Sequence, residues 1–82
     1  MSAESGDAVA VIARAIQRYC SLHPEAADNA EGVQRWWLPA LLHEEPLPLV
    51  QAALQRLVEK RVMRTIELDD GTVIYANVRE IA

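Results

Sequence analysis

The sequence has little of what catalytic and metal sites are usually built from. Cys20 is the only cysteine, which excludes an internal disulfide and a cysteine-based metal cluster. The two histidines, His23 and His43, do not stand at the spacing of a metal-binding motif. The three glycines are scattered, so there is no glycine-rich phosphate loop, and there is no nucleophile elbow. We therefore expect no enzymatic activity, no cofactor and no metal, and see no sign of a small-molecule substrate.

Long apolar runs and aromatic residues are also scarce. No apolar stretch approaches the ~20 residues of a transmembrane helix, and no signal peptide is evident, which predicts a cytoplasmic chain without a membrane partner. Phenylalanine is missing, and the aromatic residues are two tyrosines and the adjacent Trp36 and Trp37. In a domain of 82 residues with a modest core, the tryptophans should carry a large share of the packing or of a contact.

The basic excess that most nucleic-acid-binding proteins carry is missing as well. The chain has 12 acidic and 8 basic residues and a net charge of −4, and the whole acidic excess falls in residues 1–45. Phosphate neutralisation supplies much of the affinity for nucleic acids, so this balance disfavours DNA as the partner. Seven of the eight basic residues are arginine, a bias typical of a GC-rich bacterial source.

The amino-terminal part of the chain predicts a short tail and a helix. Residues 1–6 are small and polar and are predicted to be disordered, with a single domain over residues 7–82. Apolar residues recur at helical spacing from Ala8 to about Leu22. The sequence His23-Pro24 should end this helix, because the residue before proline avoids the α region.

A second helix is expected to begin after a short loop. Asp28 has an acidic residue three positions later, which is capping-box spacing, and Asn29 is the competing cap. Val33 and Trp37 lie one turn apart and should face the core together. Residues 39–45 predict either a short helix or a small strand that pairs with a later hairpin.

The clearest element is a third helix that begins near Pro46. Prolines are tolerated there because the first turn of a helix lacks internal amide partners. Acidic residues precede the predicted helix and basic residues end it, and both placements suit the helix dipole. Its apolar stripe consists of Leu47, Val50, Ala53, Leu54, Leu57 and Val58.

A β-hairpin is expected directly after this helix. Residues 62–68 and 72–78 alternate in polarity and are joined around Asp70-Gly71, a strong turn signal. If Asp70 and Gly71 are the two loop residues, Leu68 faces Val73 and Ile66 faces Tyr75, and these four side chains share one face of the sheet. Glu67 and Ile74 would then share the outer face.

The stretch VQAALQRLVEKRVMRTIELDDGTVIY, preceded by two further helices, resembles the winged helix-turn-helix family. The corner after the family's third helix resembles residues 57–62, and the wing resembles residues 63–75 with Asp69-Asp70-Gly71 at its tip. The resemblance covers roughly residues 8–78 and implies an α+β fold, a three-helix winged helix-turn-helix with a C-terminal β-hairpin wing. Family members bind DNA, RNA or proteins. The family's corner often carries glycine where this chain has Arg61.

Protein contact is the function that the sequence favours. We expect a non-enzymatic interaction module, a bacterial regulatory protein that binds a protein partner or forms a homodimer. One tryptophan should lie at the surface with Leu38, Leu41 or Leu49, whereas the alternative has both tryptophans packed beneath residues 39–45. The predicted protein-contact residues are Trp36, Leu49, Ala52, Gln55 and Arg56.

The alternative is a double-stranded DNA-binding transcriptional regulator that uses the third helix. Glutamine can pair with adenine and arginine with guanine in the major groove. The carboxylates that precede this helix and those at the wing tip would instead repel phosphates. The predicted DNA-contact residues are Gln51, Gln55, Arg56, Lys60 and Arg64.

Overall fold

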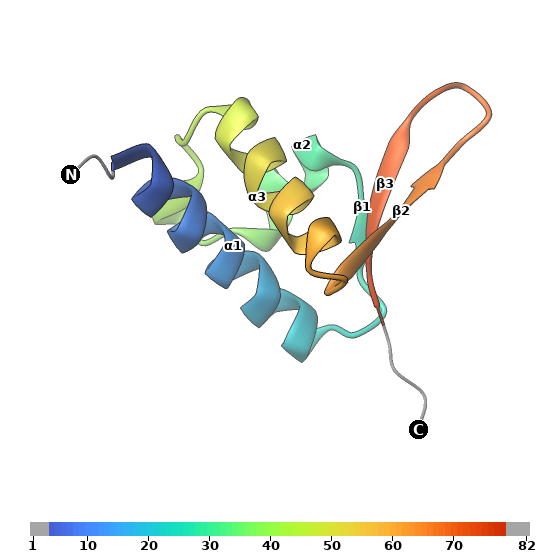
Figure 1. Ribbon diagram of the computed structural model, residues 1–82, viewed down its shortest axis with the longest axis horizontal. Coiled ribbons are helices and arrows are strands. Elements are labelled where there is room, and N and C mark those ends of the chain that lie inside the picture. Colours follow the sequence, from blue (N-terminus) through green and yellow to red (C-terminus); the bar gives the residue numbers. More distant parts are fainter. Residues whose placement is uncertain (1–3, 79–82) are drawn as a thin grey trace.

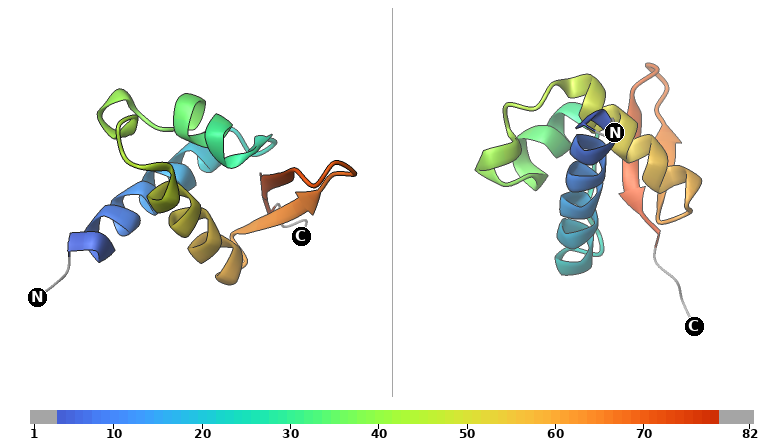
Figure 2. Two further views of the ribbon diagram at one scale, coloured as in Figure 1. Left: turned by 90° about the horizontal axis from the view of Figure 1, so that it is seen from above. Right: turned by 60° about the vertical axis from the view of Figure 1, so that its left-hand side comes forward.

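The computed structural model describes residues 4–78, which form three helices and a three-stranded antiparallel sheet (Figure 1). The fold class is α+β, as predicted. The helices gather on one side, and the β-hairpin extends away from them, as the further views also show (Figure 2). A projecting hairpin leaves much of its own surface exposed.

The first helix, α1, spans Glu4–Leu22. It begins before the predicted start at Ala8, so residues 4–6 are helical rather than disordered, and residues 1–3 lie outside the described part of the chain. The last helical bond of this segment joins the amide of His23 to the carbonyl of Tyr19 at 2.8 Å, and Pro24 cannot donate the next one.

The second helix, α2, spans Ala30–Gly32 and continues as a π-helical turn, η1, over Val33–Trp37. Asn29 is its cap, because its side-chain oxygen accepts a 2.8 Å hydrogen bond from the amide of Gly32. The carboxylate of Asp28 accepts a hydrogen bond from the amide of Asn29 instead. Of the two predicted caps, Asn29 rather than Asp28 therefore caps the helix.

Residues 39–45 adopt the helical alternative. A short 3-10 helix, η2, spans Ala40–Leu42, with Pro39 at its start. The amide of Leu42 donates to the carbonyl of Pro39 at 2.8 Å. The side-chain amide of Gln34 donates to the carbonyl of Glu45 at 2.6 Å, which ties this segment to η1.

The third helix, α3, spans Leu47–Glu59 and ends in a Schellman motif. The amide of Val62 donates to the carbonyl of Leu57, and the amide of Arg61 donates to that of Val58, both at 2.9 Å. This motif requires a left-handed residue, and Arg61 occupies it with φ 64°. An arginine thus occupies the left-handed position where such a motif usually has glycine.

The sheet has the strand order β1-β3-β2. β2 spans Met63–Glu67, and β3 spans Val73–Asn77. A two-residue strand, β1, spans Ala27–Asp28 between the first two helices and pairs antiparallel with β3. This strand was not predicted, because two residues are too few to show an alternating pattern.

The predicted hairpin register is wrong by one residue. Ile66 lies opposite Ile74 rather than Tyr75, and the loop contains three residues, 69–71, rather than two. The amide of Leu68 donates to the carbonyl of Thr72 at 2.8 Å, and Gly71 has φ 91°. A left-handed glycine as the last residue of a three-residue loop is a common hairpin closure. As a result, Ile66 and Ile74 share the outer face, and Tyr75 lies on the face that packs on the helices.

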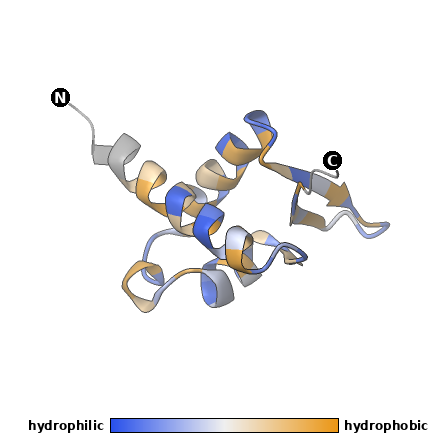
Figure 3. Cartoon of the chain, turned by 90° about the horizontal axis from the view of Figure 1, so that it is seen from below, coloured by the Kyte–Doolittle hydropathy of each residue, from blue (hydrophilic) through white to orange (hydrophobic). Residues whose placement is uncertain are grey.

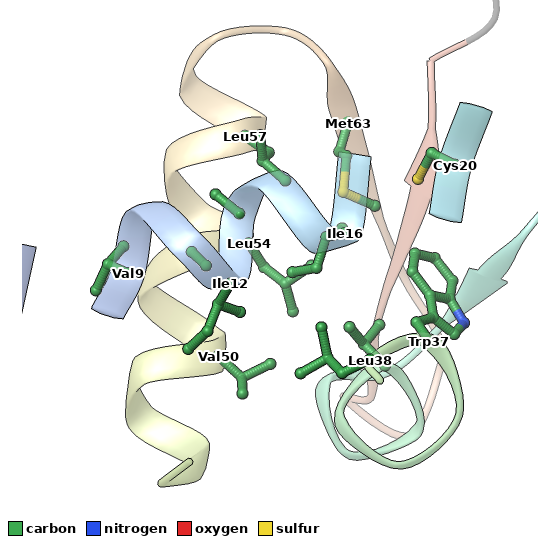
Figure 4. Close-up of a cluster of buried hydrophobic side chains, with 13 residues drawn as sticks. Val9, Ile12, Ile16, Cys20, Trp37, Leu38, Val50, Leu54, Leu57 and Met63 are labelled. Atoms are coloured by element: carbon green, nitrogen blue, oxygen red, sulfur yellow. The ribbon is translucent and has the colours of Figure 1, made fainter. Parts of the chain in front are cut away.

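The core lies between α1, α3 and η1, where their apolar side chains point toward one another (Figure 4). Met63 closes it from β2. The ring of Trp37 stacks on the ring of Tyr19, with the ring centroids 4.9 Å apart. The centroid of the Tyr19 ring also lies 4.2 Å from that of the His23 ring. The buried core residues follow the helical stripes that the sequence predicts: Val9, Ile12, Ala13, Ile16 and Cys20 in α1, and Val50, Ala53, Leu54 and Leu57 in α3.

Candidate functional site

The two adjacent tryptophans have opposite environments. Trp36 is 70% exposed, whereas Trp37 is only 6% exposed, so one tryptophan lies at the surface and the other in the core, as predicted. Leu38 is buried and does not accompany Trp36, contrary to one of the predicted pairings. Trp36 instead borders a polar depression together with Asp28, Glu31 and Arg35.

The remaining predicted protein-contact residues lie on α3, whereas Trp36 lies on η1. Ala52 and Gln55 are exposed, and the side-chain amide of Gln55 donates to a carboxylate oxygen of Glu59 at 3.4 Å. Leu49 and Arg56 are half-buried. Arg56 lines a depression between α3 and α1, a different depression from the one beside Trp36.

The residues predicted for DNA contact are also dispersed. Gln51 lies in a groove between α3 and the hairpin, where Glu31 and Tyr75 are among its neighbours. Lys60 lies with Arg56 on the side of α3 that faces α1, and Arg64 is exposed on the outer face of β2. Gln51 and Arg56 therefore line different depressions.

A groove along α1 is the main surface feature that the sequence analysis missed. Two depressions, of about 280 and 330 Å³, share Ala15, Arg18 and Pro39 and so adjoin one another. We call their combined surface the α1 groove; its lining includes the apolar residues Val11, Ala15, Leu22, Pro39, Leu41 and Leu42 and the basic residues Arg14 and Arg18. Leu41 is 90% exposed, Leu22 68% and Val11 47%.

The α1 groove is also locally basic. Arg14 borders both this groove and the neighbouring depression that holds Arg56 and Lys60. Among residues 8–78, whose side chains the structure describes, none that lines these three depressions is acidic. Four of the eight basic residues of an acidic chain therefore gather on this side of the molecule. In the hydropathy view, hydrophobic and strongly hydrophilic residues both occur along α1, and the hairpin tip is hydrophilic (Figure 3).

A sequence signal for this groove exists. Val11, Ala15 and Leu22 are spaced at i, i+4 and i+11, which places them on one side of a helix, separate from the core stripe. The sequence alone does not reveal that residues 39–42 pack alongside this second stripe. The groove needs both segments.

The groups with reactive chemistry are used structurally. Cys20 is buried, and this burial raises the pKa of its thiol, which keeps it neutral and unreactive. A ring nitrogen of His43 lies 2.8 Å from the carbonyl oxygen of Leu38. Among the described residues, no cluster of histidine, cysteine or acidic side chains could hold a metal ion, and no helix is long and apolar enough to cross a membrane.

Comparison with known proteins yields no relative. No family model matches the chain, and no curated protein or solved structure matches it either. The resemblance to winged helices therefore stays a prediction.

Proposed function

We propose that this chain is a winged-helix interaction module without enzymatic activity, a bacterial regulatory protein that acts through contacts with another protein. The succession of three helices and a carboxy-terminal β-hairpin supports the winged-helix assignment. The open hairpin and the exposed side chains on the helices give such a module surface to offer a partner.

The observation that carries this proposal is the exposure of large apolar side chains in the helical part. Single exposed apolar residues are normal in soluble proteins. Here Leu22 and Leu41 border the same groove. The exposed indole of Trp36 lies five positions before Leu41 in the sequence. Clustered apolar surface and exposed tryptophan are typical of protein-contact sites.

The charges that duplex DNA would meet on α3 and at the hairpin tip also favour a protein partner. Glu44 is exposed just before α3, and Asp69 and Asp70 are exposed at the hairpin tip. A duplex docked on the amino-terminal part of α3 would bring its phosphates toward these carboxylates, which lowers affinity. Gln55, which could read a base, is hydrogen-bonded to Glu59.

Site-specific photo-crosslinking tests the proposal. A benzophenone amino acid is introduced in place of Trp36 or Leu41, and in a control in place of Asp69 at the hairpin tip. In cells that naturally express the chain, we expect discrete protein adducts from the first two positions and none from the control. The same amino acid in place of Gln51 or Gln55 probes the alternative. Nucleic-acid adducts from positions 51 and 55, or no protein adduct from positions 36 and 41, would overturn the proposal.

Binding of duplex DNA is the second candidate function. The observation that favours it is the grouping of Arg14, Arg56 and Lys60 around one depression, which could contact a phosphate backbone. This site would use the flank of α3 rather than its outward face. Its test is the salt-dependent gel retardation described in the Discussion.

A further inference from the structure

We propose that the α1 groove binds an acidic amphipathic helix of a partner protein. This inference rests on the proposed protein-binding function and deepens it, because it names the surface and the chemistry of the partner.

The lining of the groove suits apolar side chains from a helix. One wall is α1, which contributes Val11, Ala15 and Leu22, and the other is the segment from Pro39 to Leu42. An amphipathic helix inserts residues at i, i+3, i+4 and i+7 into such a groove. The two adjoining depressions, of about 280 and 330 Å³, lie at or below the lower end of small-molecule pockets, which span about 300–1,000 Å³. They provide successive sites for side chains rather than one enclosed site for a ligand.

The charges beside the groove select an acidic partner. Arg14 and Arg18 lie on α1 at the groove, and Arg56 and Lys60 lie in the depression that Arg14 also borders. Within the described residues, these four side chains make no hydrogen bond or ion pair. Guanidinium groups bind carboxylates in a two-pronged geometry, so acidic residues flanking the apolar face of a helix would find partners here. Charge complementarity of this kind gives specificity and speeds association.

A second copy of the chain fits this surface poorly. In a two-fold symmetric contact the same patch meets itself, so Arg14 and Arg18 would face their own counterparts. Within residues 8–78, the lining of the groove includes no carboxylate that could neutralise these arginines. Nucleic acid fits poorly as well, because the apolar lining offers phosphates nothing.

The binding test uses the full chain and a designed 18-residue peptide labelled with a fluorophore. The peptide carries leucine at i, i+3, i+4 and i+7 and glutamate on both flanks of that face. Fluorescence anisotropy should show saturable binding with a micromolar Kd at about 50 mM salt. A peptide with lysine in place of glutamate, and one of the same composition in scrambled order, should bind at least tenfold more weakly.

Variants of the chain assign the binding to the groove. Leu41→Glu and the double variant Arg14→Glu/Arg18→Glu should each weaken binding of the glutamate peptide at least tenfold. Leu68→Glu is the matched control, because Leu68 is also an exposed leucine but lies on the hairpin. This variant should bind the glutamate peptide with the affinity of the unmodified chain. Arg14→Ala/Arg18→Ala provides a milder pair if the charge reversal impairs folding, and circular dichroism verifies each variant.

The outcomes separate this inference from the broader proposal. Chemical shifts that change in α1 and residues 39–42 on addition of the peptide support the groove. The inference would be overturned by a lack of saturable binding up to 1 mM peptide, by equal binding of the lysine peptide, or by chemical-shift changes confined to the hairpin. In any of these cases, protein cross-links from position 36 would still support the broader proposal of a protein-binding function. Two further results would overturn the inference. One is a dimer of the free chain that Leu41→Glu abolishes. The other is binding of duplex DNA or anionic vesicles that requires Arg14 and Arg18 but not Leu41.

Discussion

Trp37 stacks on Tyr19 with the two ring planes only 12° apart, and this contact fixes the second helical segment, η1, against α1. The neighbouring Trp36 takes no part in it and is 70% exposed. Two identical side chains at adjacent positions therefore have separate roles, one in the core and one at the surface. The separation can be tested by comparing the stability of two variants.

Trp37→Ala should destabilise the protein strongly, and Trp36→Ala should not. Removal of a buried tryptophan leaves a cavity and costs about 3–5 kcal/mol, whereas a surface substitution stays within about 0.5 kcal/mol. Urea unfolding followed by circular dichroism measures both free energies of unfolding. Equal effects of the two substitutions would contradict the assignment of Trp37 to the core.

Gly32→Ala should destabilise the protein although it lies in a helical turn. A methyl group at this position would run into the carboxylate of Asp28. This carboxylate can move aside, but only by giving up the 2.8 Å hydrogen bond that it accepts from the amide of Asn29. Alanine normally stabilises a helix relative to glycine by about 0.5–1 kcal/mol, but losing a hydrogen bond to a charged group costs about 1.5–3 kcal/mol and should reverse the sign. Thermal unfolding of Gly32→Ala, Asp28→Ala and the double variant measures the coupling between the two positions. If the glycine substitution costs as much without the Asp28 side chain as with it, the proposed clash is wrong.

Arg61→Gly should stabilise the protein. Arg61 has φ 64°, and a non-glycine residue in this left-handed conformation carries a strain of about 1–2 kcal/mol. Glycine relieves the strain but is more flexible when unfolded, so a net gain of about 0.5–1 kcal/mol is expected. Arg61→Ala is the control, since it removes the side chain but keeps the strain and should change stability little. A gain with alanine as large as that with glycine would show that the side chain, rather than the backbone, is responsible.

Asp70 should titrate below the ordinary range of an aspartate. The side-chain and backbone hydrogen bonds of Thr72 lower the pKa of this carboxyl group, and one of them joins the amide of Thr72 to Oδ1 at 2.9 Å. A carboxyl whose pKa is lower in the folded state stabilises the fold above its unfolded pKa, and this contribution is lost as the pH falls through the folded pKa. Titration followed by NMR measures the pKa of Asp70 directly. Asp70→Asn keeps an acceptor oxygen but cannot titrate, so this part of the acid dependence of stability should disappear in that variant.

The helices were predictable because their signals are local. The core stripes of α1 and α3 repeat at helical spacing, and Asn29 stands at one of the two positions predicted for the cap. The hairpin register was not predictable, since Asp70-Gly71 is compatible with a loop of two residues or of three. The φ of Gly71 and the pairing of Leu68 with Thr72 decide between them, and both depend on the whole hairpin.

The candidate site was less predictable than the fold. The outward direction of Trp36 follows from the helical phase set by Val33 and Trp37, so its exposure could be inferred. The α1 groove could not, because Val11 and Leu41 come from segments distant in the sequence. The direction of Arg56 toward α1 depends in the same way on how two helices pack.

The central claim, that the chain recognises protein rather than nucleic acid, is tested most directly by gel retardation of a random DNA duplex at about 50 mM salt. We predict no retarded complex even at high protein concentration, because carboxylates flank the start of α3 and occupy the hairpin tip. A retarded complex whose affinity falls steeply as salt rises, and which is lost in Gln55→Ala/Arg56→Ala or in Arg14→Ala/Lys60→Ala, would contradict the account.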